Sequence, residues 1–424
     1  MSQSGRDDLG EWSPMTSPAL TATVDLGAIA HNLDVLRNAS HAPVMAVVKA
    51  DAYGHGAVPV ARAVLAAGAA ELGVAHITEG IALRAAGIDA PITAWLHTPG
   101  ADFDAAIAND IEVALSSPRQ LEAVVAAARR AGVRASVTVK VDTGLNRSGV
   151  AVDEWDVFVR EIAKAHAEES VVLRGVMCHL ARGDEPGHPL NDEQAGRLDR
   201  AVDDLTRAGV APEVVHMANS PAALTRPDLA RDMVRPGIAL YGRTPIPERG
   251  DFGLIPAMTL SAQVALVKNV AAGEGVSYSQ TWIAPRDTVV AVVPAGYADG
   301  VPRLLSGHLR VRIGERLFDG IGRICMDQLV IDLGPDGAGV REGDEVELFG
   351  TGRHGGPTAR DWADAIGTID YEIVSQIGNR VVRSYVDPQA PGPAADDDST
   401  GDPRRAAGGG QGDARRPDDW GGEP

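Results

Sequence analysis

Residues 44–56 read VMAVVKADAYGHG, and this stretch gives the first indication of the fold. Five apolar residues form a run that is typical of a fully buried strand, and a lysine, an aspartate, a tyrosine and a Gly-His-Gly turn come after it. Burying a cation is costly unless a partner or a reaction removes its charge. Lys49 therefore either extends into solvent from the end of the strand or takes part in chemistry, and this stretch alone leaves both interpretations open.

Seven further apolar runs follow, with helical patterns between them. The eight predicted strands cover residues 44–48, 71–75, 91–96, 110–116, 135–141, 172–180, 212–217 and 237–242. The helical pattern at 117–132 begins with Ser-Pro and ends with Gly, which are typical helix boundaries. Near-continuous apolar strands joined by helices indicate a parallel sheet covered on both faces. Eight such repeats in about 200 residues predict an α/β fold of the (β/α)8, or TIM, barrel type.

Changes in composition and hydrophobic periodicity divide the chain into four parts. We expect a flexible arm at 1–18, the barrel at 19–250, a mostly β second domain at 251–387 and a disordered tail at 388–424. The apolar run at 19–26 would be a ninth strand, so we expect it to pair with the second domain.

The composition favours a cytoplasmic enzyme that acts on small molecules. A formal charge of −19 disfavours nucleic acid and anionic membranes as partners. The two cysteines, Cys178 and Cys325, lie far apart and form no CxxC pair, which argues against a disulfide framework or a cysteine-rich metal site. No run approaches the ~20 apolar residues that a membrane-spanning helix needs.

Polar residues collect where four of the predicted strands end. They are Lys49 after the first strand, Lys140, Asp142 and Arg147 after the fifth, His179 after the sixth, and His216, Asn219 and Ser220 after the seventh. Each group alone is a weak indication of a functional site, because strand ends are polar in any barrel. Reacting residues of barrel enzymes lie at these ends, so the four groups together predict a polar site there.

The stretch from 216 to 242 indicates a phosphate site. Ser220 followed by Pro221 is typical of a helix N-terminus, where free N–H groups attract anions. Gly237 allows backbone N–H groups to approach a ligand closely. The alternative is ordinary helix capping with a turn glycine. A phosphate opposite the amine of Lys49 is the arrangement that pyridoxal 5'-phosphate requires, because its aldehyde condenses with a lysine.

Seven motifs in this chain resemble those of the bacterial alanine racemase family. They are AVVKADAYGHG, KVDTGLNRSG, HMANSPA, RPGIALYG, GVSYSQTW, PAGYADGVPR and GRICMDQ, and the resemblance covers about residues 19–386. It implies an isomerase that interconverts L-alanine and D-alanine and supplies D-alanine for peptidoglycan.

The resemblance also implies roles for individual residues. Lys49 matches the lysine that carries the cofactor and acts as one catalytic base, and Arg235 matches the arginine that faces the pyridine nitrogen, with His179 holding that arginine. Lys140 matches a lysine that is carbamylated in several relatives. The implied cofactor-binding residues are Lys49, Tyr53, Arg147, His179, Asn219, Ser220, Arg235, Gly237, Ile238 and Tyr371.

Racemisation needs an acid/base group on each face of the α-carbon. Tyr278 matches the second base, which in the family reaches the site from the partner subunit of a head-to-tail homodimer, as does Met326. Tyr297 and Met326 would narrow the substrate entrance, and Arg147 would also contact the substrate. Three alternatives remain open: a broad-specificity racemase on the same scaffold, a pyridoxal-phosphate-dependent decarboxylase, and a single-barrel carrier of the cofactor.

Overall fold

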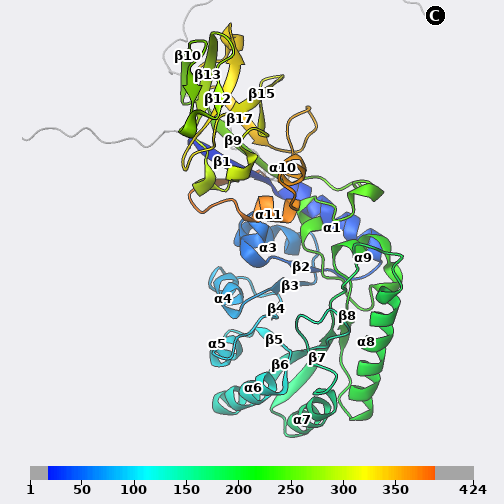
Figure 1. Cartoon of the computed structure of the whole chain (residues 1–424). Helices are drawn as coiled ribbons and strands as arrows, with labels where there is room; N and C mark the ends of the chain where they lie inside the picture. Colours follow the sequence, from blue (N-terminus) through cyan, green and yellow to red (C-terminus); the bar gives the residue numbers. More distant parts are fainter. Residues whose placement is uncertain (1–17, 387–424) are drawn as a thin grey trace, which may run out of the picture. The chain divides into compact units, whose positions relative to one another are not determined.

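Seven short parallel strands form the sheet that carries the candidate site (Figure 1). The computed structural model describes residues 18–386, so the predicted tail and nearly all of the predicted arm lie outside the described residues. The strands are hydrogen-bonded in sequence order, and most of their residues are buried. They are β2 (Met45–Val47), β3 (Glu71–Val74), β4 (Ile92–Ala94), β5 (Glu112–Leu115), β6 (Ala135–Lys140), β7 (Val171–Met177) and β8 (Val214–His216).

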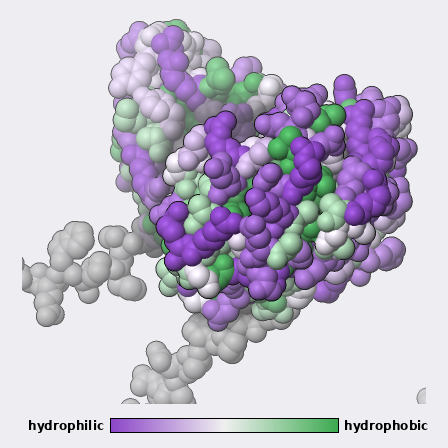
Figure 2. All heavy atoms as spheres, turned by 90° about the horizontal axis from the view of Figure 1, so that it is seen from below, coloured by the Kyte–Doolittle hydropathy of each residue, from purple (hydrophilic) through white to green (hydrophobic). Residues whose placement is uncertain are grey.

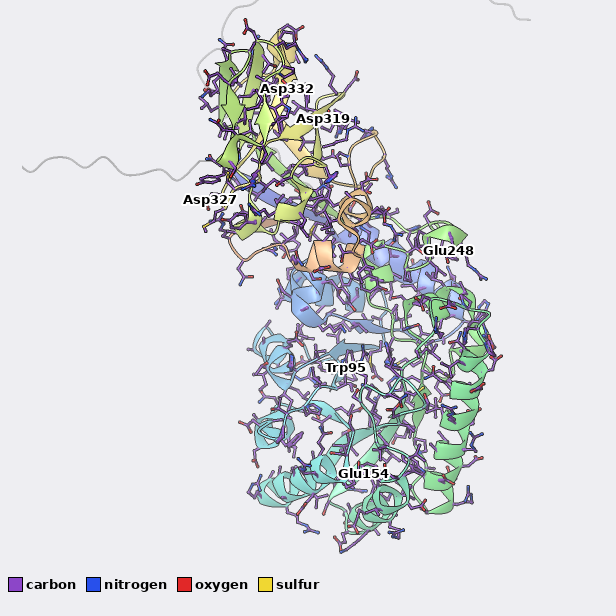
Figure 3. The ribbon with its side chains drawn as sticks, in the orientation of Figure 1. Trp95, Glu154, Glu248, Asp319, Asp327 and Asp332 are labelled. Atoms are coloured by element: carbon purple, nitrogen blue, oxygen red, sulfur yellow. The ribbon has the colours of Figure 1, made fainter. Side chains whose placement is uncertain are left out.

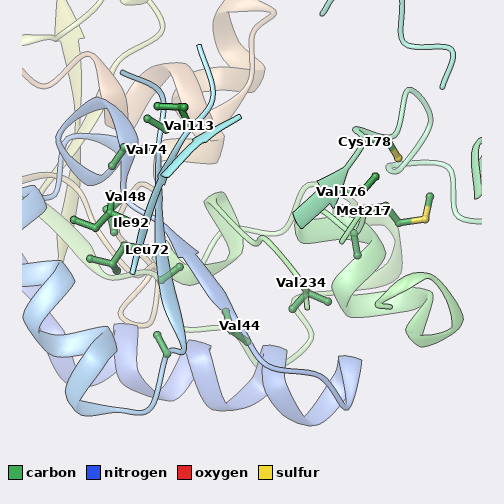
Figure 4. Close-up of a cluster of buried hydrophobic side chains, with 14 of the residues drawn as sticks. Val44, Val48, Leu72, Val74, Ile92, Val113, Val176, Cys178, Met217 and Val234 are labelled. Carbon is green, nitrogen blue, oxygen red and sulfur yellow. The ribbon is translucent and has the colours of Figure 1, made fainter. Parts of the chain in front are cut away.

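The eighth strand, predicted at 237–242, is wrong: Ile238–Tyr241 form a 3-10 helix, η2. An extended segment just before η2 lies between the two edges of the sheet instead. Val234 forms a parallel bridge to Val44, which lies one residue before β2 (Figure 4). The backbone N–H of Arg235 donates to the carbonyl of Ala218, which lies two residues after β8. The rest of the predicted fold class, an α/β barrel-type sheet with a mostly β second domain, is confirmed.

Helices alternate with these strands. They are α2 (Lys49–Tyr53), α3 (Ala57–Ala66), α4 (Ile77–Ala85), α5 (Phe103–Ala108), α6 (Pro118–Ala131), α7 (Trp155–Ala167), α8 (Leu190–Arg207) and α9 (Ser220–Thr225). The boundaries predicted for α6 are confirmed. Ser117 caps its N-terminus by accepting from Gln120 N, and Gly132 ends it in the left-handed conformation with φ 67°. The absence of a membrane-spanning helix applies to residues 18–386, where none is both long and apolar enough.

A second, nine-stranded sheet forms the β domain. Its strands are β1 (Leu20–Asp25), β9 (Met258–Gln263), β10 (Leu266–Val270), β13 (Thr288–Val293), β14 (Arg310–Ile313), β15 (Arg316–Ile321), β16 (Leu329–Gly334), β17 (Glu345–Phe349) and β18 (Val382–Val386). β1 lies between β9 and β18, antiparallel to the former and parallel to the latter. The helix that follows β1, α1 (Leu26–Ser40), packs against α3, α9 and η2 instead. The chain therefore enters the β sheet first and the barrel second.

Short elements complete the β domain. They are the strands β11 (Gly275–Val276) and β12 (Trp282–Ile283), the helices α10 (Ala359–Ile366) and α11 (Asp370–Ser375), and the 3-10 helices η4 (Tyr278–Gln280), η5 (Tyr297–Asp299), η6 (Arg303–Leu305) and η7 (Gly337–Gly339).

Two large apolar cores stabilise the two sheets. The larger fills the barrel and includes the buried residues labelled in Figure 4, and the smaller fills the β domain, where Val276, Val290 and Ile321 form a further small cluster. Tyr53 packs against both cores, which places it where the barrel meets the β domain. Figure 2 shows one face of the surface, where hydrophilic residues predominate and hydrophobic ones form separate small patches.

Candidate active site

Lys49 lies two residues after the end of β2, the first barrel strand, and begins an unusual turn. Residues 50–53 all have positive φ, between 51° and 55°, although none is a glycine. This conformation costs roughly 1–2 kcal/mol per residue for L-amino acids, so tertiary contacts must hold it. Glu79 supplies one, because its Oε1 accepts from Ala50 N at 2.7 Å. The turn thus fixes the backbone that directly follows Lys49.

Four cationic side chains converge near the ends of the barrel strands. Burial and, to a lesser extent, the charges of Arg235, Arg147 and Lys49 together lower the pKa of Lys140 to about 8, although the Asp142 carboxylate partly opposes this shift. Burial and the Arg147 charge also lower the pKa of the half-buried Lys49. Such a concentration of positive charge is unfavourable by itself and favours an anionic ligand.

Arg235 lies at the centre of this cluster and is only 6% exposed. Its Nη1 lies 3.1 Å from His216 Nδ1, and its Nη2 donates to the Cys178 carbonyl at 2.6 Å. Burial, reinforced by the Arg235 charge, lowers the pKa of His216 well below its usual range, so the imidazole is neutral and its Nδ1 accepts from Arg235. Arg235 is therefore held with a fixed orientation.

The expectation that His179 holds Arg235 is wrong, because among the described residues His216 makes that hydrogen bond. His179 is half-buried near the same cations: burial and the charges of Arg235 and Arg147 lower its pKa to about 3. It is therefore a neutral ring that borders the cationic cluster.

Ser220 is not the helix cap that the sequence indicated. Asn219 is the N-cap of α9, and its side chain accepts from Ala222 N at 3.4 Å. The Ser220 hydroxyl instead accepts from Gly237 N at 2.9 Å and from Ala239 N at 3.3 Å. Two backbone N–H groups and a hydroxyl therefore converge at the start of η2, which is the donor set that a phosphate group needs.

Tyr53 closes this donor set on one side. A Cβ atom at Gly237 would lie 2.1 Å from Tyr53 Oη, so only glycine fits at this position. The Tyr53 ring lies 4.9 Å from that of Tyr241 and 6.4 Å from that of Tyr371. Lys49 Nζ lies 5.9 Å from the centroid of the Tyr53 ring, which brings the amine and the phosphate-type donors to one region. Ile238, the first residue of η2, is buried beneath them.

Tyr278, Tyr297 and Met326 lie on neighbouring loops of the β domain. Their side chains are 71%, 43% and 52% exposed, which is high for residues of this size. Tyr297 N donates to Cys325 O at 3.0 Å, and the Ser277 hydroxyl lies 3.4 Å from Cys325 Sγ, so the three loops are in contact. No described hydrogen bond links this group to the cationic cluster of the same chain. An exposed set of large side chains is typical of a contact with another protein.

Sequence reasoning missed several residues that support the site. One is Glu79, whose contact with Ala50 N leaves no local pattern in the sequence. His216 was predicted to lie at a strand end, but its role as the hydrogen-bond partner of Arg235 was not. Arg323, whose Nη1 donates to Ser279 Oγ at 2.8 Å beside Tyr278, is another. Arg174 also pairs with two buried carboxylates, Glu71 and Glu112, to form an ion triad on the barrel sheet.

Both halves of the chain match models of known protein domains. Residues 24–245 match the alanine racemase N-terminal domain, and residues 257–385 match the alanine racemase C-terminal domain. The two ranges meet near residue 250, where we propose the domain boundary.

Relatives of known identity match nearly the whole chain. An alanine racemase of Mycolicibacterium smegmatis is 57% identical over 378 residues, which cover 88% of this chain and 97% of that protein. One of Mycobacterium tuberculosis is 56% identical over 365 residues, covering 86% and 95%. The crystal structure of the alanine racemase from D-cycloserine-producing Streptomyces lavendulae has a TM-score of 0.85 at 47% identity and covers 88% of this chain and 98% of that one.

Proposed function

Because the chain belongs to the alanine racemase family, we propose that it interconverts L-alanine and D-alanine with pyridoxal 5'-phosphate as its cofactor. The observation that carries this proposal is the cationic cluster of Lys49, Lys140, Arg147 and Arg235, in which burial and neighbouring charges lower the pKa of both lysine amines. Alanine is favoured over a broader range of substrates by the identity of the close relatives.

The residues of the site fit the cofactor. The phosphate would accept from Gly237 N and the Ser220 hydroxyl, beside Tyr53, Ile238 and Tyr371. Its negative charge would offset the excess of positive charge, which the few nearby carboxylates do not neutralise. Because Gly237 and Tyr53 are in close contact, the recess has no room for a larger residue. Asn219 would contribute by fixing the backbone just before Ser220.

Arg235 would determine the electronic character of the bound ring. Burial lowers its pKa to about 10, so it remains a cation at neutral pH and can only donate hydrogen bonds. Facing the ring nitrogen, it would leave that nitrogen unprotonated. When bound, the cofactor withdraws electrons from the α-carbon and acidifies its proton. A guanidinium partner moderates this withdrawal and thereby limits side reactions such as decarboxylation.

Two bases would move the α-proton. The lowered pKa of Lys49 makes a neutral Nζ available to accept a proton on one face. Tyr278 of the partner subunit would serve the other face through its phenolic oxygen, because on its own chain this side chain is 71% exposed. A head-to-tail homodimer would bring the two together, with Tyr297 and Met326 from the same partner bordering the substrate. Arg147 and His179 would orient the substrate carboxylate and the ring substituents. The product D-alanine would enter peptidoglycan synthesis in the cytoplasm.

The test compares the wild type with Lys49→Ala, with Lys268→Ala on exposed β10 as a matched control. Borohydride should fix the cofactor on Lys49, which peptide mass spectrometry would locate. In D₂O the wild type and the control should exchange the α-proton of either alanine enantiomer with inversion, and Lys49→Ala should not. Racemisation by Lys49→Ala at the wild-type rate would refute the proposal.

A further inference from the structure

The loops that carry Tyr297 and Met326 are held against each other by their backbones. Tyr297 N donates to Cys325 O, and Ala298 N donates to Met326 O, both at 3.0 Å. A Cβ atom at Gly296 would lie 2.3 Å from Met326 O, so the two loops touch without space between them. The spacing of the Tyr297 and Met326 side chains therefore follows from how these loops are fixed.

Arg380 joins both loops through one guanidinium group. Its Nε pairs with Asp299 Oδ1 at 2.5 Å and its Nη2 with Asp327 Oδ1 at 2.7 Å. The same Nη2 lies 3.0 Å from Asp299 Oδ2 and 3.4 Å from Met326 O. Asp299 ends the turn that begins with Tyr297, and Asp327, labelled in Figure 3, directly follows Met326. A planar fork of donors imposes a geometry that a single amine would not.

The two carboxylates differ in what they need from Arg380. The Asp299 side chain is 7% exposed, and its only other described partner is Gly296 N at 2.8 Å. The Asp327 side chain is 63% exposed and can be solvated. Removing the guanidinium would leave Asp299 as a buried charge with one hydrogen bond, so the turn that holds it would rearrange.

Residues on either side of Arg380 connect its segment to both halves of the site, Gly378 to the turn that carries Tyr297 and Arg383 to the barrel. Gly378 N donates to Asp299 O at 2.9 Å, and Arg383 donates to the carbonyls of Gly378 at 2.6 Å and Gly54 at 3.2 Å. Gly54 follows Tyr53 in the cofactor half of the site. Segment 376–383 therefore connects the cofactor region near Tyr53 with the loops of Tyr297 and Met326, which would contribute to the active site of the partner subunit.

We propose that Arg380 is a positioning residue that fixes the gap between Tyr297 and Met326 and thereby excludes amino acids larger than alanine from the partner's site. The proposal rests on the proposed function, because it assumes that these side chains border the substrate. Serine differs from alanine by one hydroxyl group, and apolar pockets discriminate against such an addition by about 100-fold at most. Discrimination of this size depends on the gap staying narrow.

The test uses the full-length holoenzyme and three variants. Arg380→Met removes the clamp, Arg380→Lys keeps a cation that can reach a carboxylate, and Arg310→Met removes an exposed ion pair, with Asp319, elsewhere on the same sheet. Two quantities are measured. The first is kcat/KM for serine relative to alanine, with kcat and KM resolved separately. The second is the hydrogen-exchange rate of the Tyr297 and Ala298 amides.

In Arg380→Met we expect both amides to exchange at least about 10-fold faster and the serine-to-alanine ratio of kcat/KM to rise by about 10-fold. The Arg380→Lys variant should lie between it and the wild type, and Arg310→Met should match the wild type. An unchanged serine-to-alanine ratio in Arg380→Met would overturn the proposal, including one that results from equal losses of kcat/KM on both substrates. If the wild type does not racemise alanine, the proposed function fails, whereas the exchange rates still test the clamp.

Discussion

Reaction with carbon dioxide should change the charge of Lys140. Its pKa of about 8 makes roughly one amine in ten neutral at pH 7, against about one in 3,000 for an ordinary lysine. A neutral amine adds to the carbon of CO₂, and loss of one proton leaves a carbamate anion. The fraction of Lys140 amine that is neutral and able to react is therefore about 300-fold larger than that of a lysine in water. The product would turn one of four clustered cations into an anion beside Arg147 and Arg235.

The carbamate can be detected by ¹³C NMR after equilibration with labelled bicarbonate at pH 8. We expect a carbamate resonance in the wild type and in Lys268→Met, and none in Lys140→Met. Because the neutral fraction falls about tenfold for each pH unit below the pKa of Lys140, the reaction should slow between pH 8 and pH 6. No resonance at pH 8, or one that persists in Lys140→Met, would refute the reasoning.

Two substitutions test the packing around the site. Gly237→Ala places a Cβ 2.1 Å from Tyr53 Oη, so cofactor titration into the apoprotein should show about 10- to 100-fold weaker binding, whereas Gly100→Ala, with no atom within 4 Å of its added Cβ, should bind normally. Arg174→Met leaves the two carboxylates of the ion triad buried without their cation, which should lower the free energy of unfolding in urea by about 3–5 kcal/mol. Normal binding by Gly237→Ala, or unchanged unfolding of Arg174→Met, would contradict the respective packing argument.

The sequence predicts the alternation of strands and helices well because burial on both faces leaves long apolar runs. It fails at 237–242, where an apolar run is compatible with either a strand or a buried 3-10 helix. Pro236, just before this run, has no N–H to donate to a neighbouring strand. The Tyr241 hydroxyl donates to the Val47 carbonyl, so η2 packs against the end of β2. Length and periodicity alone cannot separate the two outcomes.

The residue types of the candidate site could be predicted from the sequence, but the hydrogen-bond partners of these residues could not. Lys49 could be identified because it follows an apolar run, whereas Arg235 was identified only through the resemblance to the alanine racemase family. The choice between His216 and His179 as partner of Arg235 depends on side-chain orientations, which two His residues at adjacent strand ends do not reveal. The left-handed turn at 50–53 was also missed, because it contains no glycine and is held by Glu79, far along the sequence.

The account depends on one amine and one phenol that meet across two chains. The most direct test mixes inactive Lys49→Ala and Tyr278→Phe proteins under conditions of subunit exchange. Random pairing makes half of the dimers mixed, each with one intact site, so racemisation should recover to about a quarter of the wild-type rate. If both residues served the site of their own chain, no chain in the mixture would hold both, and the sample would stay inactive. An inactive sample after proven subunit exchange would contradict the shared site.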